Sequence, residues 1–347
     1  MTSPAFAAVQ RQVLNPAGMS ETETGAVVDL LINGELDAAE GAELLVAWTH
    51  RGETAVELAA VVWNLLARAQ VAASPACMDL CGTGGSGLTR FNVSTTAAFV
   101  LAALGVPVAK HGNRGSARPN GGFDLLDALA VPYQLSPERL ARLHAESGVC
   151  FLFARQMHPA VAAVAPARKL AAQRARRTVF NLAGPLANPF RPRRQIVGVS
   201  DERVARVVAE ALLRLGSERA VVVLGHPGID ELSISGPSHL WEVHDGRVHH
   251  RIAEHFHQPG LTHDQLPGGD APVNKHLFLR LLSGEERGPL LDLVCVNAGA
   301  ALDCWHGRPI LADGQGIAAA RAALESGKVG AAFAKHQALA RELAAAP

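Results

Sequence analysis

The chain has 347 residues, of which 48% are hydrophobic and 18% are charged. A chain of this length and composition can bury a large core in one or two domains, which excludes a disordered protein. Its 32 Lys and Arg residues balance 32 Asp and Glu residues. The overall positive charge that is typical of nucleic-acid-binding proteins is therefore missing, and we expect no nucleic-acid partner.

The cysteines and the apolar runs indicate the cellular compartment. Five cysteines, an odd number, are scattered along the chain at positions 77, 81, 150, 295 and 304, so we expect free buried thiols and no disulfide framework. The first fifteen residues lack the pattern of a secretory signal, and runs such as residues 99–104 are too short to cross a membrane. We therefore expect a cytoplasmic protein with no membrane partner.

The first 72 residues predict a small unit made of helices. Ser20, Asp37 and Thr54 each stand before a segment with helical spacing of apolar residues, at 25–32, 38–48 and 55–69. The apolar positions of residues 27–46 are compatible with internal packing or with a dimer face.

From Cys77 onward the pattern alternates between strands and helices. A strand at 77–81, a helix at 94–104, a strand at 106–110 and a helix from about Asp124 predict a βαβ unit in a parallel sheet. Further strands are predicted at 149–153, 195–199 and 220–224, with an antiparallel extension at 231–235 and 240–243. Helices are predicted at 203–215, 271–282, 289–305 and 316–345, the last broken near Gly327. The expected fold is α/β, with a small all-helical N-terminal domain (1–72) beside a larger α/β domain (77–347) whose mainly parallel central sheet is flanked by helices.

Two glycine-rich loops follow neighbouring strands. Residues 82–87 read Gly-Thr-Gly-Gly-Ser-Gly, and residues 92–95 (Asn-Val-Ser-Thr) open the next helix. Closely spaced glycines let backbone amides approach an anion, and a helix start adds unpaired N–H groups. The second loop, residues 110–115, reads Lys-His-Gly-Asn-Arg-Gly and adds positive charge. Together they predict a phosphate-binding site, although a tight turn or a solvated basic turn would show the same residue types.

Asp230 and Glu231 stand next to each other after a predicted strand. Adjacent acids are commonly a solvated surface pair. In a phosphate-binding protein they become candidate oxygen ligands for Mg²⁺, which takes few carboxylates and completes its shell with water and substrate phosphates.

Further motifs are His158-Pro159-Ala160, residues 177–181 (Arg-Thr-Val-Phe-Asn), Gly184-Pro185-Leu186 with Asn188-Pro189, and residues 228–233. Together with the two glycine-rich loops and residues 92–95, they resemble the anthranilate phosphoribosyltransferase family. They occur in that family's order, and the resemblance extends from the N-terminal to the C-terminal helices. It implies that a helical segment around 166–190 joins the N-terminal helices in one small domain, which is hinged to the α/β domain. It also implies a homodimer, which usually forms through the helical domain. It also implies Mg²⁺-assisted transfer of the phosphoribosyl group from phosphoribosyl diphosphate to the amine of anthranilate, in tryptophan biosynthesis.

The resemblance also implies a role for individual residues. The expected donor-binding residues are Gly82, Gly85, Ser86, Thr89, Asn92, Ser94, Thr95, Lys110, Arg114 and Arg118. The expected acceptor-binding residues are Gly82, His111, Asn113, Arg168 and Pro185, and the expected metal ligands are Ser94, Asp230 and Glu231. Lys110, Asn113 and Arg168 are the expected catalytic residues.

Three departures from the family's pattern bear on the substrates. Ser86 stands where the family usually has Asp, and Ala117-Arg118-Pro119 replaces hydroxyl and basic residues of the second loop. The segment that follows Pro166 is about three residues longer than usual, so Arg174, Arg176 and Arg177 compete with Arg168 for the acceptor. Two alternatives therefore stay open: a related transferase or phosphorylase-like enzyme with another acceptor, and a non-catalytic paralogue that only binds ligand.

The histidines at positions 249, 250, 255 and 257 lack the spacing of a metal site. We interpret them as surface residues in a loop-rich region.

Overall fold

The computed structural model describes residues 3–70, 76–115, 119–175, 177–254 and 256–346. Their centre is a sheet of seven strands in the order β3-β2-β1-β4-β5-β6-β7. The strands are β1 (Met78–Gly82), β2 (Val108–Gly112), β3 (Val149–Phe153), β4 (Arg194–Gly198), β5 (Arg219–Gly225), β6 (Ser238–His244) and β7 (Arg247–Ala253). The first five are parallel, and β6 and β7 extend the sheet in antiparallel fashion. The predicted α/β class with a mainly parallel sheet is confirmed.

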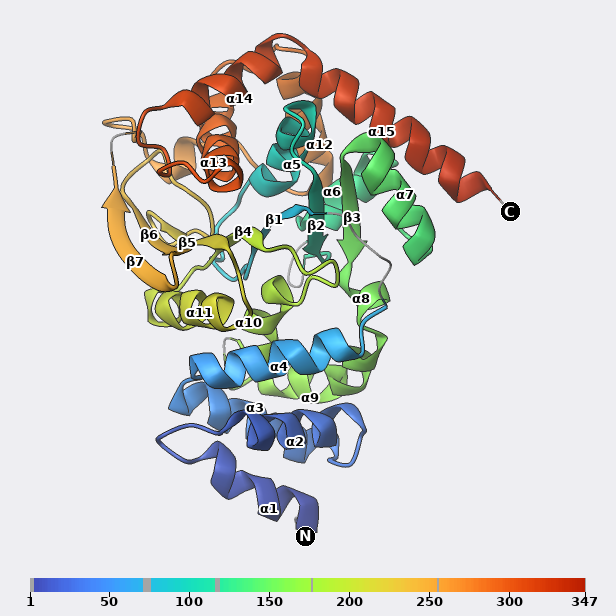
Figure 1. The fold of residues 1–347 in the computed structure, drawn as a ribbon, viewed down its shortest axis with the longest axis vertical. Helices are drawn as coiled ribbons and strands as arrows, with labels where there is room; N and C mark the ends of the chain where they lie inside the picture. Colours follow the sequence, from blue (N-terminus) through green and yellow to red (C-terminus); the bar gives the residue numbers. More distant parts are fainter. Residues whose placement is uncertain (1–2, 71–75, 116–118, 176, 255, 347) are drawn as a thin grey trace.

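Helices surround this sheet (Figure 1). They are α1 (Pro4–Val13), α2 (Glu21–Ile32), α3 (Ala38–Arg51), α4 (Ala55–Ala67), α5 (Val93–Ala103), α6 (Gly122–Ala128), α7 (Pro137–Ser147), α8 (Ala154–Met157), α9 (Ala165–Ala171), α10 (Val179–Leu186), α11 (Glu202–Arg214), α12 (Ala271–Leu282), α13 (Pro289–His306), α14 (Gln315–Glu325) and α15 (Lys328–Ala345), with short 3-10 helices at Pro159–Val164 and His263–Gln265. None of the helices in the described part of the chain has the length and apolarity needed to cross a membrane.

The N-terminal helices begin where the sequence predicts. Ser20, Asp37 and Thr54 each accept a hydrogen bond from the backbone of the next turn, and Glu23, Glu40 and Glu57 reach back to complete three capping boxes. The sequence analysis missed α1, although Ser3 caps it and Pro4 occupies its first position. It also missed α7, which has the same Ser-Pro start at Ser136.

The two faces of the sheet carry separate hydrophobic cores. Successive strand residues point to opposite faces, so Leu80 packs with α5, α13 and α15, whereas Cys81 packs with α10, α11 and the N-terminal helices. The order of the strands reverses between β1 and β4. In parallel sheets such a switch point opens a crevice at the carboxyl ends of the strands.

The N-terminal helices lie as a layer below the sheet in Figure 1, with α4 against α10 and α11 and α3 against α9. Helices α9 and α10, which lie around the predicted joining segment at 166–190, therefore pack with this layer, and the layer shares one continuous core with a face of the sheet. The apolar side chains Val27, Val28, Leu44, Leu45 and Val46 are buried within the chain. Internal packing is thus the outcome for this segment.

Two elements differ from the sequence-based expectation. The predicted strand at 231–235 is wrong, because the backbone of Leu232 pairs with the side chain of Asn297 and not with a neighbouring strand. The antiparallel extension is formed by β6 and β7, which are joined by Asp245-Gly246 with positive φ at both residues. His249 and His250 are exposed, as expected, but they lie in β7 and not in a loop; His255 is outside the described residues.

All five cysteines are buried and none of them forms a disulfide, as the sequence predicts.

Buried His336 makes stability depend on pH. Removal from water lowers the pKa of His336 to about 4, whereas an unfolded histidine titrates near about 6.5. Below about pH 6.5 the unfolded chain therefore binds a proton that the folded chain does not, so acid favours unfolding. We expect the stability advantage of the native protein over His336→Gln to shrink by about 2 kcal/mol between about pH 7 and about pH 5. Denaturant unfolding at both pH values measures this, and an unchanged advantage would contradict it.

Candidate active site

Asp230 and Glu231 lie on the ends of three neighbouring strands. Gly82, Gly198 and Gly225 are the last residues of β1, β4 and β5. A Cβ atom on Gly82 would overlap the Asp230 carboxylate, and one on Gly198 would overlap the carbonyl oxygen of Asp230. A Cβ atom on Gly225 would overlap the carbonyl oxygen of Glu231. Only glycines let the acidic pair sit this close to the switch point of the sheet.

The first glycine-rich loop, which from here on includes residues 88–92 that join it to α5, is held by Asp230. Gly84, Gly85 and Gly87 have φ values of 67°, 86° and 73°, which side chains other than glycine rarely tolerate. The Gly84 N–H donates to Asp230 Oδ2 at 2.8 Å, and Ser200 Oγ donates to the Gly84 carbonyl at 2.8 Å. Arg90, from the same loop, forms an ion pair with Asp230 Oδ1. One carboxylate therefore fixes both ends of the loop.

Helix α5 begins without a side-chain cap. Asn92 occupies the cap position, but its side-chain amide donates to the Asn120 carbonyl at 2.8 Å instead of accepting from the helix. No described side chain accepts from the first-turn N–H groups of Val93, Ser94 and Thr95. Unpaired amides at the positive end of a helix form an anion site. Thr95 is buried and Ser94 half-buried beside them.

Lys110 lies in the middle of β2, and its side chain reaches the neighbouring strand β1. Its ammonium group is buried and donates to the Leu80 carbonyl at 2.6 Å. Burial lowers the pKa of Lys110, and the charge of nearby Asp79 opposes this effect. A Cβ on Gly122 would touch both Thr95 and Lys110, so the missing side chain at Gly122 brings these two groups together.

His111 faces the opposite side of the sheet from Lys110. Its Nδ1 lies 3.0 Å from the Gly184 carbonyl, and its ring packs edge-on against His158 with centroids 5.2 Å apart. Burial, and then the neighbouring His158, lower the pKa of His111 to about 3. The next residue of α10, Pro185, accepts from Cys81 Sγ at 3.3 Å. Expected acceptor residues thus gather between β2 and α10.

The four competing arginines are in different environments. Arg168, on α9, is half-buried with its guanidinium 5.8 Å from the centroid of the Phe180 ring, and burial lowers its pKa. Arg177 forms an ion pair at 2.7 Å with buried Glu53, and Arg174 is exposed. Arg176 lies outside the described residues. Of the three that are described, Arg168 is the one that is half-buried and forms no ion pair with a described acidic residue.

Four of the expected substrate-binding residues, the donor residues Arg114, Ser86 and Thr89 and the acceptor residue Asn113, show no contact with Asp230 or with the start of α5. Arg114 bonds to Asp127 at 2.9 Å and to the Tyr133 hydroxyl at 2.7 Å. Asn113 accepts from the Arg114 N–H, and Ser86 accepts from the Leu88 N–H. Thr89 is exposed. Ala117 and Arg118 lie outside the described residues.

The acidic pair fits a divalent cation that is completed by substrate and water. Burial raises the pKa of Glu231 to about 7, with Arg90 opposing, and no described residue hydrogen bonds to its carboxylate or forms an ion pair with it. A divalent cation would give this carboxylate a direct ligand partner and would favour its ionised form. Among the residues that the structure describes, no three His, Cys, Asp or Glu side chains gather to hold a metal alone. The donor set therefore matches an ion such as Mg²⁺, which keeps few protein ligands.

The sequence analysis assigned no role to Asp79, Asn188, Arg90 and Asn274. Asp79 is buried in β1, accepts from the His111 N–H at 3.2 Å and accepts from Asn188 at 2.8 Å. Burial raises the pKa of Asp79 to about 6, and Lys110 opposes this shift. A charged residue inside an apolar strand was a visible signal for Asp79. Asn274 lies far from both loops in the sequence, and no local sequence pattern predicts its contacts with Arg90 and Asn92.

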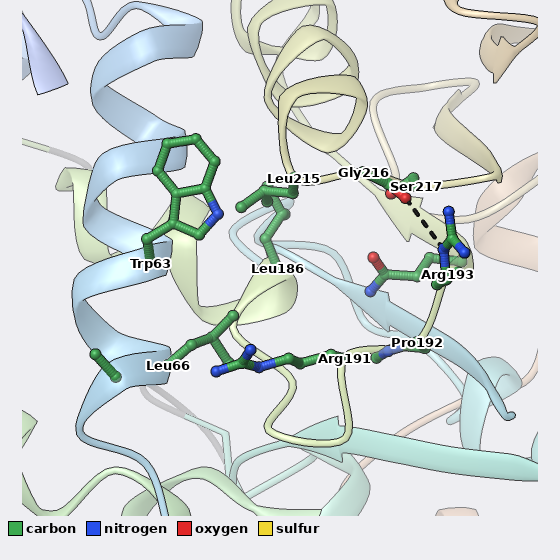
Figure 2. A pocket seen from close by; sticks show the side chains of 11 residues that line it. Trp63, Leu66, Leu186, Arg191, Pro192, Arg193, Leu215, Gly216 and Ser217 are labelled. Atoms are coloured by element: carbon green, nitrogen blue, oxygen red, sulfur yellow. Dashed lines mark hydrogen bonds between the residues drawn. The ribbon is translucent and has the colours of Figure 1, made fainter. Parts of the chain in front are cut away.

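A hollow of about 180 Å³ lies at the other end of the strands, before β4 begins. Trp63 and Leu66 of α4 face Leu186, Leu215 and residues 191–193 across it (Figure 2). It contains none of the expected site residues. The candidate site is thus an open edge of loops and not this hollow.

Comparisons with known proteins agree with this geometry. Residues 74–330 match the family described as glycosyl transferase family, a/b domain. The anthranilate phosphoribosyltransferase of Rubrobacter xylanophilus is 41% identical over 329 residues, which cover 94% of this chain and 95% of that protein. This chain belongs to the anthranilate phosphoribosyltransferase family.

Other members of the anthranilate phosphoribosyltransferase family are also similar to this chain along nearly its whole length. The Chloroflexus aggregans enzyme is 40% identical over 89% of this chain and 91% of its own. The crystal structure of the Thermus thermophilus enzyme matches with a TM-score of 0.87 and 38% identity, over 96% of this chain and 99% of that one. The Saccharomyces cerevisiae enzyme, solved with phosphoribosyl diphosphate and Mg, shares the fold with a TM-score of 0.84 at 23% identity, over 98% of this chain and 99% of that one.

The contact between Gly198 and Asp230 predicts the result of a substitution. Gly198→Ala forces the Asp230 peptide away from β4, so we expect a loss of about 1–3 kcal/mol in stability together with weaker binding of the anionic donor. Gly25→Ala is the matched control, because nothing lies within 4 Å of a Cβ there. This helix-interior change is expected to stabilise by about 0.5–1 kcal/mol. Thermal unfolding and calorimetry measure both variants, and an unaffected Gly198→Ala protein would contradict the contact.

Proposed function

We propose that the protein transfers the phosphoribosyl group from phosphoribosyl diphosphate to the amine of anthranilate and releases diphosphate, a step of tryptophan biosynthesis. The observation that carries this proposal is the uncapped start of α5 beside buried Lys110 and the Asp230-Glu231 pair, at the switch point of the sheet. Relatives that carry this activity in their names are 41% and 40% identical along nearly the whole chain.

The donor side of the site stabilises the departing diphosphate. Displacement at the anomeric carbon builds negative charge on the leaving group and positive charge on the sugar ring. The first-turn amides of α5 are already oriented and need no reorganisation. Lys110 adds a full positive charge, held by the Leu80 carbonyl. Ser94 offers a hydroxyl at the same helix start.

Mg²⁺ is the proposed cofactor, and Ser94, Asp230 and Glu231 are the residues that would hold it. The ion would neutralise phosphate charge as diphosphate departs. Arg90 already pairs with Asp230, so the protein itself places a cation at this point of the site.

The acceptor side of the site orients an aromatic amine that bears a carboxylate. Arg168 is a half-buried guanidinium with no acidic partner among the described residues, and it suits a carboxylate clamp. His111 is neutral at physiological pH because burial lowers its pKa to about 3, so with Pro185 it offers an uncharged wall. Asn113 would add an amide. An aryl amine is already a neutral nucleophile and mainly requires positioning.

A homodimer in the cytoplasm is part of the proposal. The large apolar side chains Val27, Val28, Leu31, Leu44, Leu45 and Val46 are buried inside the chain, so a dimer face on the helical layer would use other residues. The large apolar side chains exposed on this layer are Leu14, Trp63 and Leu170, with 52%, 39% and 39% of their surface exposed.

The direct test is the decay of anthranilate fluorescence when the purified protein meets phosphoribosyl diphosphate and Mg²⁺. We expect rapid decay that releases diphosphate and stops with a chelator. Donor binding without decay would show that the acceptor is a different molecule. No donor binding would favour the non-catalytic paralogue.

The metal assignment predicts a specific loss. In Asp230→Asn with Glu231→Gln we expect turnover to fall by about 100-fold or more. Glu231→Gln alone should melt no lower than the native protein at neutral pH, because it removes a carboxylate that burial disfavours. The adjacent pair Glu285→Gln with Glu286→Gln, in the α12–α13 connection, is the matched control and should keep full activity. Near-normal turnover in the first double variant would sink the assignment.

A further inference from the structure

Asn274 lies at the start of α12, far along the chain from both glycine-rich loops. It is fully buried, with 0% of its surface exposed. Its Oδ1 accepts from the Gly269 N–H at 2.9 Å. Its Nδ2 donates to the Arg90 carbonyl at 3.0 Å and to Asn92 Oδ1 at 2.9 Å. Every polar atom of this side chain is therefore used, and two of the three bonds go to the first loop.

The start of α12 also contacts Pro119, which with Asn120 lies between the second loop and α6. The Ala271 N–H donates to the Pro119 carbonyl at 3.1 Å, and Asn92 Nδ2 donates to the Asn120 carbonyl. Gly268 packs so closely that a Cβ on it would lie 2.5 Å from the Arg90 carbonyl carbon. The path Asn274–Asn92–Asn120 thus runs from α12 through the first loop to the segment between the second loop and α6.

This path decides what Asn92 does. An asparagine at a helix start ordinarily accepts from the first-turn amides with its side-chain oxygen. Here Asn274 occupies that oxygen and Asn120 accepts from the nitrogen, so both polar atoms are turned away from the helix. The first-turn amides of α5 stay open, and they are the groups that the proposed function assigns to the diphosphate.

We propose that Asn274 is a positioning residue of the donor site. It holds Asn92 away from the cap position and ties the first glycine-rich loop to the segment that follows the second, without touching the donor itself. The inference rests on the proposed function for the identity of the donor.

The test compares two substitutions with a control of similar burial. Asn274→Asp keeps an acceptor for the Gly269 N–H but sets a carboxylate oxygen against the oxygens of Arg90 and Asn92. Asn274→Ser introduces no charge and keeps the proposal testable if the Asp variant does not fold. His336→Gln changes a buried, hydrogen-bonded side chain on α15 and reports the effect of lost stability alone.

We expect the Kd and the KM for phosphoribosyl diphosphate, measured with Mg²⁺, to rise about 10-fold or more in both Asn274 variants. The KM for anthranilate should change less than about 2-fold, within the scatter of a remote substitution. A merely structural role predicts a lower active fraction with an unchanged donor KM, as in His336→Gln.

A double-mutant cycle tests whether Asn274 acts through Asn92. In an Asn92→Ala background we expect Asn274→Ser to weaken donor binding much less than it does in the native background, because the side chain it positions is gone. Additive effects would overturn the proposal, as would an unchanged donor KM in folded Asn274 variants. If the native protein binds no phosphoribosyl diphosphate, the proposed function itself fails, and that result is distinct from native binding that the variants retain.

Discussion

The site depends on how closely Asp230 approaches the backbone of the sheet. Three glycines at the ends of adjacent strands leave room for the Asp230-Glu231 dipeptide, and a methyl group on any of them would overlap it. Because Asp230 then accepts from Gly84 and pairs with Arg90, the conformation of the first loop follows from this contact. A surface pair of acids has become a fixed part of the switch point. The left-handed positions of this loop, 84, 85 and 87, are all glycines, which adopt positive φ without steric strain.

In the proposed function, the two substrates would lie on opposite faces of the sheet. Alternation along β2 sends Lys110 toward α5 and α6 and His111 toward α10, so two neighbouring residues serve opposite faces. Asp79 joins the faces, since it accepts from the His111 backbone and from Asn188 while its charge acts on Lys110. The anionic donor and the aromatic acceptor would thus approach from different layers and meet at the strand ends. A single-layer fold has no equivalent partition.

The sequence predicted the parallel strands, most helices and both glycine-rich loops, because these depend on local signals. Ser20, Asp37 and Thr54 start helices through bonds within one turn, and strand β3 follows from a continuous apolar run. The alternating apolar residues at 231–235 led to a wrong strand prediction, because the Leu232 N–H donates to the side chain of Asn297 on a distant helix instead of to a neighbouring strand. Exposed edge strand β7 escaped because its histidines hide its alternation. Arg90 and Asn274 were missed for a similar reason: their partners lie 140 and 182 residues away (230 − 90; Asn92 to Asn274).

The open start of α5 has a consequence for the energetics of the whole chain. A helix of eleven residues that lacks its cap forgoes about 1 kcal/mol of local stability, and an anion bound there would supply the missing acceptor. The ligand then completes a secondary-structure element as well as occupying a site. Occupancy and folding become linked equilibria, in which free ligand at about 100 times its Kd adds about 2.7 kcal/mol to the folded state. The protein would therefore have a higher free energy of unfolding in a cell rich in the donor than in a cell that has exhausted it.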